Sequence, residues 1–165
     1  HLILAPRHTD RAGEVEGLIR FHGLSFARRS EKKMRLHTAP DVTLVDVMGE
    51  LFDLYGLADV AFCGASLVPL GGHNPLEAAA WAKPVLYGPS MEEFLDAREM
   101  LESVGAGQTA LNSNELYLKL RDLFSNPDLA RECGQAGRQA LKIRPGSADR
   151  AAELALGLLG IDKTG

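Results

Sequence analysis

Short apolar runs alternate with longer amphipathic stretches along the chain. Apolar runs bounded by Gly, Pro or Asp are typical of strands that are covered on both faces of a sheet. We expect such strands at residues 2–5, 24–27, 42–45, 59–63, 85–87 and 108–111.

The stretches between the runs repeat their apolar residues at helical spacing. The first begins at Asp10 and has Val15, Leu18, Ile19 and His22 on one face. Further helices are predicted after residues 46–50, at 76–81, from 92 to Gly105, after 112, at 128–142 and around 154–159. Strands that alternate with helices imply a parallel sheet between helices. We therefore predict an α/β fold, a Rossmann-like three-layer domain of about six parallel strands, with residues 1–165 forming one domain.

A glycine-rich loop separates the fourth strand from the next helix. Asn74 occupies the position of a helix N-cap, and Pro75 the first helical position, where its missing N–H is tolerated. Glu77 lies three residues after Asn74, so the two resemble a capping box.

The same loop carries the features of a nucleotide site. Gly71 and Gly72 allow the backbone to approach a ligand, and the helix N-terminus favours a phosphate. His73 and Asn74 add polar side chains, and Glu77 offers an acceptor for ribose hydroxyls. The alternative is an ordinary capped helix after a long loop.

Three motifs follow strands of the predicted sheet, at the edge where such sheets bind ligands. These are Arg7 after the first strand, Met48 to Glu50 after the third, and the glycine-rich loop after the fourth. Arg7 either pairs with a phosphate or is a surface residue. For Glu50 the alternatives are a hydrogen bond to a base or ribose, or no more than a favourable charge at a helix N-terminus. Met48 is more often part of a core than a ligand contact.

Composition narrows the class of protein. The chain has 165 residues, of which 45% are hydrophobic and 24% charged, and a net charge of −4, which suits one globular domain and argues against a nucleic-acid surface. The basic segment 28–40 is either a solvated loop or a patch facing anionic lipid. Cys63 and Cys133 lie far apart and form no C-x-x-C, so we expect reduced thiols in a cytosolic compartment.

The sequence lacks the signals of a metal site, a membrane span and a signal peptide. No acidic or His spacing indicates a metal site, no cofactor is expected, and no apolar run reaches the length of a membrane span. The chain opens on a strand without an initiator Met or signal peptide, so we expect a fragment cut at a domain boundary, with any membrane anchor in the missing part.

The run GASLVPLGGHNPLEAAAWAKPVLYGP at 64–89 closely resembles the bacterial Kdo transferases, where Kdo is 3-deoxy-D-manno-oct-2-ulosonic acid. The stretches 4–8 (LAPRH) and 46–51 (DVMGEL) agree with it. The resemblance covers essentially the whole chain but only the C-terminal half of such an enzyme. It implies half of a GT-B fold, which binds the donor CMP-Kdo, in an inverting glycosyltransferase that transfers Kdo to lipid A precursor (lipid IVA) in lipopolysaccharide synthesis.

The resemblance also implies roles for individual residues. The CMP-binding residues would be Pro6, Arg7, Met48, Gly49, Glu50, Asn74, Pro75, Leu76 and Glu77, and the candidate donor-phosphate loop would be Gly71, Gly72 and His73. The general base of the family is a glutamate of the N-terminal domain, so no catalytic residue is expected in this chain, and the fragment alone should be inactive. The full-length protein would act at the cytoplasmic face of the bacterial inner membrane and meet its lipid acceptor through the missing domain.

Two alternatives remain at this point. The first is another GT-B enzyme, a UDP-sugar transferase or epimerase, which would prefer uridine to cytidine nucleotides. The second is a nucleotide-binding module that regulates without chemistry, which the activity of the full-length protein would test.

Overall fold

The computed structural model describes residues 1–31 and 39–143. The expectations for most of the basic segment (32–38) and for a last helix at 154–159 lie outside these residues. By its internal contacts the chain divides into two compact units, His1–Ala58 and Asp59–Gly165. They are called unit 1 and unit 2 below, and each is described by itself.

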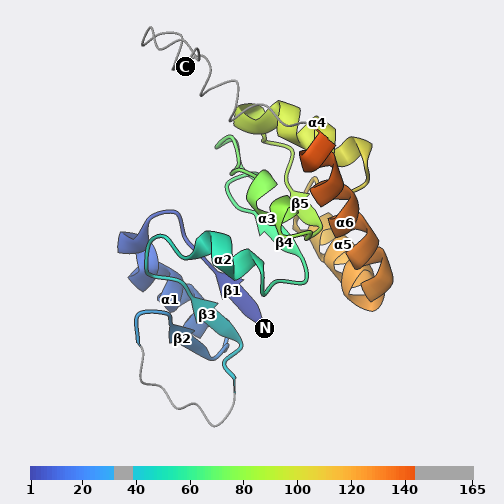
Figure 1. Cartoon of the computed structure of the whole chain (residues 1–165). Helices are drawn as coiled ribbons and strands as arrows, with labels where there is room; N and C mark the ends of the chain where they lie inside the picture. The colour runs from blue at the N-terminus through green and yellow to red at the C-terminus, as the bar shows by residue number, and fades with distance from the viewer. Residues whose placement is uncertain (32–38, 144–165) are drawn as a thin grey trace, which may run out of the picture. The chain divides into compact units, whose positions relative to one another are not determined.

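Unit 1 is built on a parallel three-stranded sheet (Figure 1). Its strands β1 (Leu2–Leu4), β2 (Phe26–Arg28) and β3 (Val42–Leu44) pair in the order β1-β3-β2. The central strand β3 buries Val42 and Leu44, because it has a neighbour on each side and α1 against it. The helical elements are a 3-10 turn η1 (Thr9–Arg11), α1 (Ala12–Phe21) and α2 (Leu51–Tyr55).

The buried face of α1 differs from the predicted one. Ala12 and Ile19 are buried, whereas Leu18 and His22 are exposed. The helix begins at Ala12, two residues later than expected, and its inward stripe runs through Ala12, the half-buried Val15 and Ile19 at i, i+3 and i+7. Periodicity therefore predicted the helix but not which of two adjacent stripes faces the sheet.

Unit 2 contains the second parallel sheet, with β4 (Ala61–Cys63), β5 (Val85–Tyr87) and β6 (Gly107–Thr109) in the order β4-β5-β6. Its helical elements are α3 (Leu76–Ala80), the 3-10 turn η2 (Glu92–Phe94), α4 (Leu95–Ser103), α5 (Ser113–Ser125) and α6 (Pro127–Ile143). All three residues of β5 are fully buried, which is why this strand reads as an unbroken apolar run.

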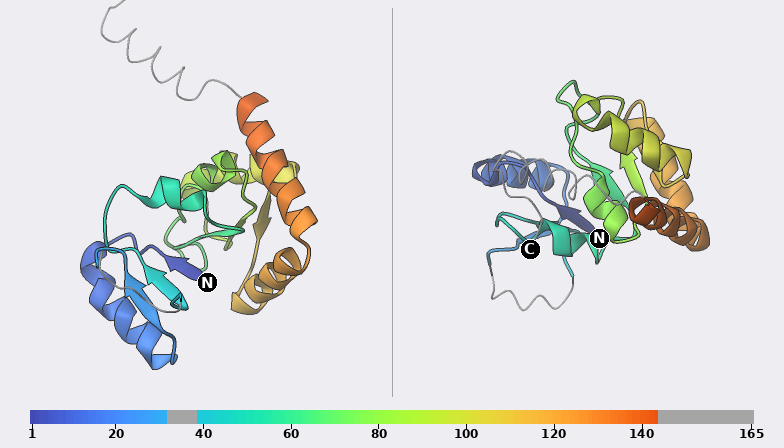
Figure 2. Two further views of the ribbon diagram at one scale, coloured as in Figure 1. Left: turned by 60° about the horizontal axis from the view of Figure 1, so that its bottom comes forward. Right: turned by 45° about the horizontal axis from the view of Figure 1, so that its top comes forward.

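The helix α6 holds unit 2 together by contacting α3, α4 and α5 (Figure 2). Gly134 and Gly137 are its buried residues. A Cβ at Gly134 would overlap the backbone carbonyl of Ala82, in the turn between α3 and β5. Glycine at this position therefore lets α6 approach the end of the short helix α3 closely.

The predicted α/β class is confirmed, and so is the parallel direction of every strand pair among the described residues. The six strands are distributed over two three-stranded sheets, where one sheet of about six strands was expected. The helix predicted after residue 112 is also confirmed as α5, and its N-terminus is capped by Asn112, whose Oδ1 accepts the Glu115 N–H at 3.0 Å. None of the helices in the described ranges combines the length and apolar character needed to cross a bilayer.

Candidate functional site

Two of the predicted motifs leave the same edge of the unit 1 sheet. Leu4 and Leu44 are in register, and the Val45 N–H donates to the Leu4 carbonyl at 2.9 Å. The Pro6–Arg7 segment and the 46–50 loop therefore follow the carboxyl ends of adjacent strands. Arg7 is exposed, and none of the hydrogen bonds and ion pairs recorded among the described residues involves its guanidinium.

The 46–50 loop presents Met48 to solvent. Its side chain is 78% exposed, so the interpretation of Met48 as a core residue is wrong. The adjacent Gly49 has φ +87°, in the left-handed region, and the loop turns here before α2 begins at Leu51. An apolar side chain held in the open beside a turn is available to a ligand.

Glu50 has a partner that the sequence did not indicate. Its carboxylate accepts from Arg29, with Nε–Oε2 at 2.6 Å and Nη2–Oε1 at 3.5 Å. Glu50 occupies the N-cap position of α2, but its side chain makes no capping hydrogen bond. The ion pair orients the carboxylate, and its second oxygen is bound only weakly, which leaves acceptor capacity for a ligand.

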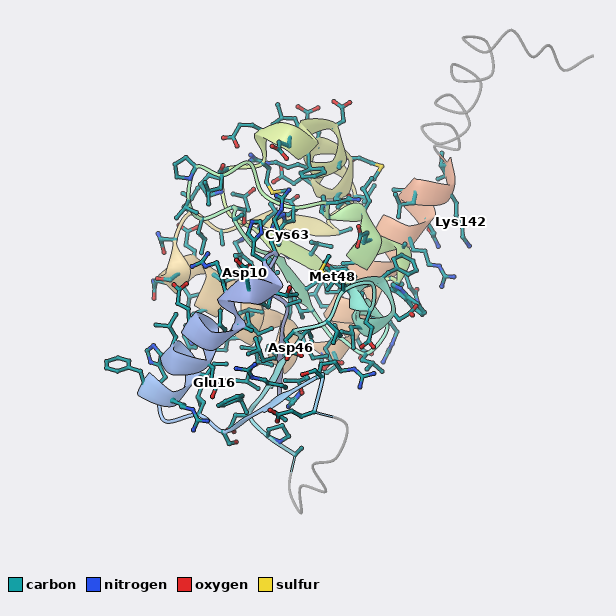
Figure 3. The ribbon with its side chains drawn as sticks, turned by 90° about the vertical axis from the view of Figure 1, so that its left-hand side faces the viewer. Asp10, Glu16, Asp46, Met48, Cys63 and Lys142 are labelled. Atoms are coloured by element: carbon teal, nitrogen blue, oxygen red, sulfur yellow. The ribbon has the colours of Figure 1, made fainter. Side chains whose placement is uncertain are left out.

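The start of the same loop is anchored by Asp46. Its carboxylate accepts from the Ser30 N–H at 2.9 Å and from the Ser30 hydroxyl at 2.6 Å. Burial by itself would raise the pKa of Asp46, but these hydrogen bonds outweigh it, and the pKa lies below its ordinary value. Arg28 Nη1 lies 3.9 Å from Asp46 Oδ2, and the same guanidinium pairs with Glu16 of α1. Asp46 and Glu16 are labelled in Figure 3. The charged groups thus tie the loop to its sheet.

In unit 2 the glycine-rich loop follows β4, as predicted, and its two adjacent glycines have φ +80° (Gly71) and +75° (Gly72). Both of their N–H groups are used inside the protein. Gly71 donates to Ser90 Oγ at 3.0 Å and Gly72 to the Ala65 carbonyl at 3.3 Å. The glycines therefore shape the loop, whereas the sequence interpretation had them bring their backbone to a ligand.

Two buried serines hold this loop, and sequence reasoning missed their role. Ser66 donates to the Cys63 carbonyl at 2.5 Å and accepts the Gly88 N–H at 2.7 Å. The Ser90 N–H donates to the Ser66 carbonyl at 3.0 Å. Ser66 and Ser90 are the buried polar side chains of the described residues. The signal was available, since each lies three residues after the end of a buried parallel strand.

The start of α3 differs from the prediction by one position, because the helix begins at Leu76 and its N-cap is Pro75, where Asn74 was expected. Asn74 Oδ1 accepts the Leu76 N–H at 3.0 Å, and Pro75 is fully buried. A capping box needs a bond from the Glu77 N–H to the Asn74 side chain and a return bond from Glu77 to the Asn74 N–H. The structure shows neither among the described residues, so the predicted capping box is wrong, and Asn74 instead accepts from the residue two positions on. The half-buried Glu77 carboxylate therefore remains an acceptor at the carboxyl edge of the sheet.

Cys63, labelled in Figure 3, ends β4 beneath this loop. Burial, with a smaller contribution from the Glu77 charge, raises the pKa of its thiol to about 12. A neutral thiol is a poor nucleophile, so Cys63 acts as a core residue. Both cysteines are free, and the described residues contain no cluster of three or more His, Cys, Asp or Glu that could hold a metal ion.

Comparison with known proteins gives relatives over most of the chain. No family model matches it. It is 34% identical over 154 residues to the 3-deoxy-D-manno-octulosonic acid transferase of Haemophilus influenzae, which covers 93% of this chain and 36% of that protein. It is 40% identical over 126 residues to the transferase of the same name from Aquifex aeolicus, and this match covers 75% of this chain and 33% of that protein. The chain thus spans about a third of the length of the curated relatives it matches.

A solved structure matches the fold. The crystal structure of the C-terminal CMP-Kdo binding domain of WaaA from Acinetobacter baumannii is similar with a TM-score of 0.78 and 29% identity, over 84% of this chain and 72% of that chain. The sequence relatives and the structural match agree with the motifs at 4–8, 46–51 and 64–89. The chain is thus similar over most of its length to 3-deoxy-D-manno-octulosonic acid transferases, and its fold is similar to the C-terminal domain of one of them.

Proposed function

We propose that this chain binds the nucleotide-sugar donor CMP-Kdo, with residues 1–165 acting as one donor-binding domain. The full-length protein would transfer Kdo to lipid A precursor at the cytoplasmic face of the bacterial inner membrane. The observation that carries this proposal is the match over 84% of the chain to a structure described as a CMP-Kdo binding domain. The similarity of the chain to several transferases of one name supports it further.

The proposed donor contacts are those that the motifs indicate. They are Pro6, Arg7, Met48, Gly49, Glu50, Asn74, Pro75, Leu76 and Glu77. The exposed Arg7 guanidinium suits a phosphate, which it can bind through two parallel hydrogen bonds. The carboxylates of Glu50 and Glu77 suit ribose hydroxyls or the amino group of cytosine, because all of these donate hydrogen bonds.

The role proposed for Gly71, Gly72 and His73 is to form the loop at the donor phosphate. The internal hydrogen bonds of the two glycines give them a conformational part in this role. Phosphate contacts would then come from the residues that the loop presents, His73 and Asn74.

Catalysis needs a second domain in this proposal. The general base would lie on the N-terminal domain of the family, which also meets the lipid acceptor. The chain described here would instead bind the donor and stabilise the leaving CMP phosphate. Since positioning of donor, acceptor and base supplies much of the rate, the isolated chain should bind CMP weakly and transfer no Kdo.

Calorimetric titration of the chain with CMP and UMP tests the binding claim, and a transfer assay on a protein with both domains tests the activity. We expect binding of CMP in preference to UMP, and transfer only with both domains. Glu77→Gln should weaken CMP binding while leaving the melting temperature nearly unchanged. A preference for UMP would favour a UDP-sugar transferase or epimerase, a two-domain protein without transfer would favour a regulatory module, and transfer by the chain alone would place a base within it.

A further inference from the structure

Ser90 is at the centre of the hydrogen bonds that hold the glycine-rich loop. It lies three residues beyond β5 and is only 6% exposed. Its N–H donates to the Ser66 carbonyl at 3.0 Å, its hydroxyl oxygen accepts the Gly71 N–H at 3.0 Å, and its hydroxyl donates to Glu92 Oε2 at 2.7 Å. One side chain therefore connects the loop after β4 with the turn after β5 and the start of η2.

The direction of the Ser90 hydroxyl follows from its partners. An ionised carboxylate can only accept, so the hydroxyl hydrogen must point to Glu92. The Gly71 N–H can only donate, and it takes a lone pair of the same oxygen. A glutamate is ionised near neutral pH, and the hydrogen bond from Ser90 lowers the pKa of Glu92 further. Glu92 thus fixes the hydroxyl in the orientation in which it accepts from Gly71.

Close packing supports the same arrangement. A Cβ at Gly72 would lie 3.0 Å from the Ser90 carbonyl oxygen and would overlap the Met91 sulfur, and Met91 is fully buried. The loop backbone therefore rests directly on residues 90 and 91. A shift of this turn would move Gly71 and Gly72, and with them the two residues that follow.

We propose that Ser90, oriented by Glu92, is a positioning residue that fixes the Gly71–Gly72 turn in the conformation that presents His73 and Asn74 to the donor phosphate. This inference rests on the proposed function, because it assigns the loop to the donor. Neither Ser90 nor Glu92 touches the donor in this proposal. Their effect on binding is transmitted through the Gly71 N–H.

The test uses the whole chain with substitutions that separate orientation from stability. Ser90→Ala removes both hydroxyl bonds, Glu92→Ala removes the acceptor, and Glu92→Gln retains an acceptor oxygen. Glu93→Ala is the matched control, because it removes an exposed carboxylate that packs beside Gly71 but has no recorded bond to Ser90. Each variant is examined for CMP affinity by calorimetry, for melting temperature, and for hydrogen exchange of the Gly71 amide by NMR.

We expect Ser90→Ala and Glu92→Ala to weaken CMP binding about five- to tenfold, the effect of losing one ordering hydrogen bond. The Gly71 amide should exchange faster in both, including without CMP, while Glu92→Gln should restore most of the affinity and Glu93→Ala should match the wild type. Unchanged Gly71 exchange and unchanged affinity in Ser90→Ala would overturn the inference. A loss of affinity only in proportion to melting temperature would also overturn it. A wild-type chain that does not bind CMP would instead refute the proposed function, while the exchange data still report on the Ser90 hydrogen bond.

Discussion

Ser66→Ala is expected to lower the free energy of unfolding of unit 2 by about 2–4 kcal/mol. The Ser66 hydroxyl is fully buried and satisfies two backbone groups, the Gly88 N–H and the Cys63 carbonyl. Each buried group left without a partner costs about 1–3 kcal/mol. The Gly88 N–H would bear the full cost, because a donor has one hydrogen, and the carbonyl a smaller one, because it has a second lone pair. The void left by one oxygen atom adds little.

Urea titration followed by tryptophan fluorescence measures this loss. Trp81 is the single tryptophan of the chain and lies in unit 2, at the end of α3, so its signal reports on that unit. With a slope of about 2 kcal/mol per M, the middle of the usual range for small proteins, the midpoint should fall by roughly 1–2 M. Ser103→Ala is the control, because the exposed Ser103 hydroxyl also donates to a backbone carbonyl, that of Met100 at 2.7 Å. It should change stability by less than about 0.5 kcal/mol. Equal midpoints for the two variants would show that the buried hydrogen bonds of Ser66 add nothing to stability.

Three further predictions concern the glycine loop, the ion pair and the thiols. Gly72→Ala should destabilise unit 2 by at least about 1–2 kcal/mol, the cost of a left-handed Ala, with overlap added, and an unchanged urea midpoint would contradict this. Arg29→Met should reduce CMP affinity severalfold, because the Glu50 carboxylate loses its orienting partner, whereas equal calorimetric affinity would show that the ion pair is incidental. Burial raises the pKa of the Cys63 thiol to about 12, so little of it is ionised at pH 8, and iodoacetamide should label the half-buried Cys133 first in the folded chain and both thiols equally in urea. Faster labelling of Cys63 in the folded chain would contradict its burial.

The strand pattern was predictable because apolar runs and their breakers are local signals. The position of β5 at Val85–Tyr87 and the start of α5 just after residue 112 followed directly from them. The division of six strands into two sheets was not predictable in this way, because it depends on which strands pair, and pairing is a long-range property.

The candidate site was predictable only in part. The motifs at the carboxyl edges were visible as short polar insertions after apolar runs. The partners of those motifs were not, because Arg29 lies 21 residues from Glu50, and Ser90 lies 19 residues from Gly71. Serine carries no hydrophobic signal, and its burial depends on the neighbouring loop. Met48 shows the opposite error, since an apolar type suggested burial where the loop holds it outward.

We propose that the chain binds the CMP part of the donor through the motifs at its sheet edges. An NMR titration of the isotope-labelled chain with CMP, with UMP in parallel, tests it most directly, because each amide reports its own environment. We expect the largest shifts at residues 6–8, 48–50 and 71–77, with CMP effective at lower concentration than UMP. Shifts confined to another surface, such as the hollow between α5 and α6 lined by Ser125 and Glu132, or equal responses to the two nucleotides, would contradict it.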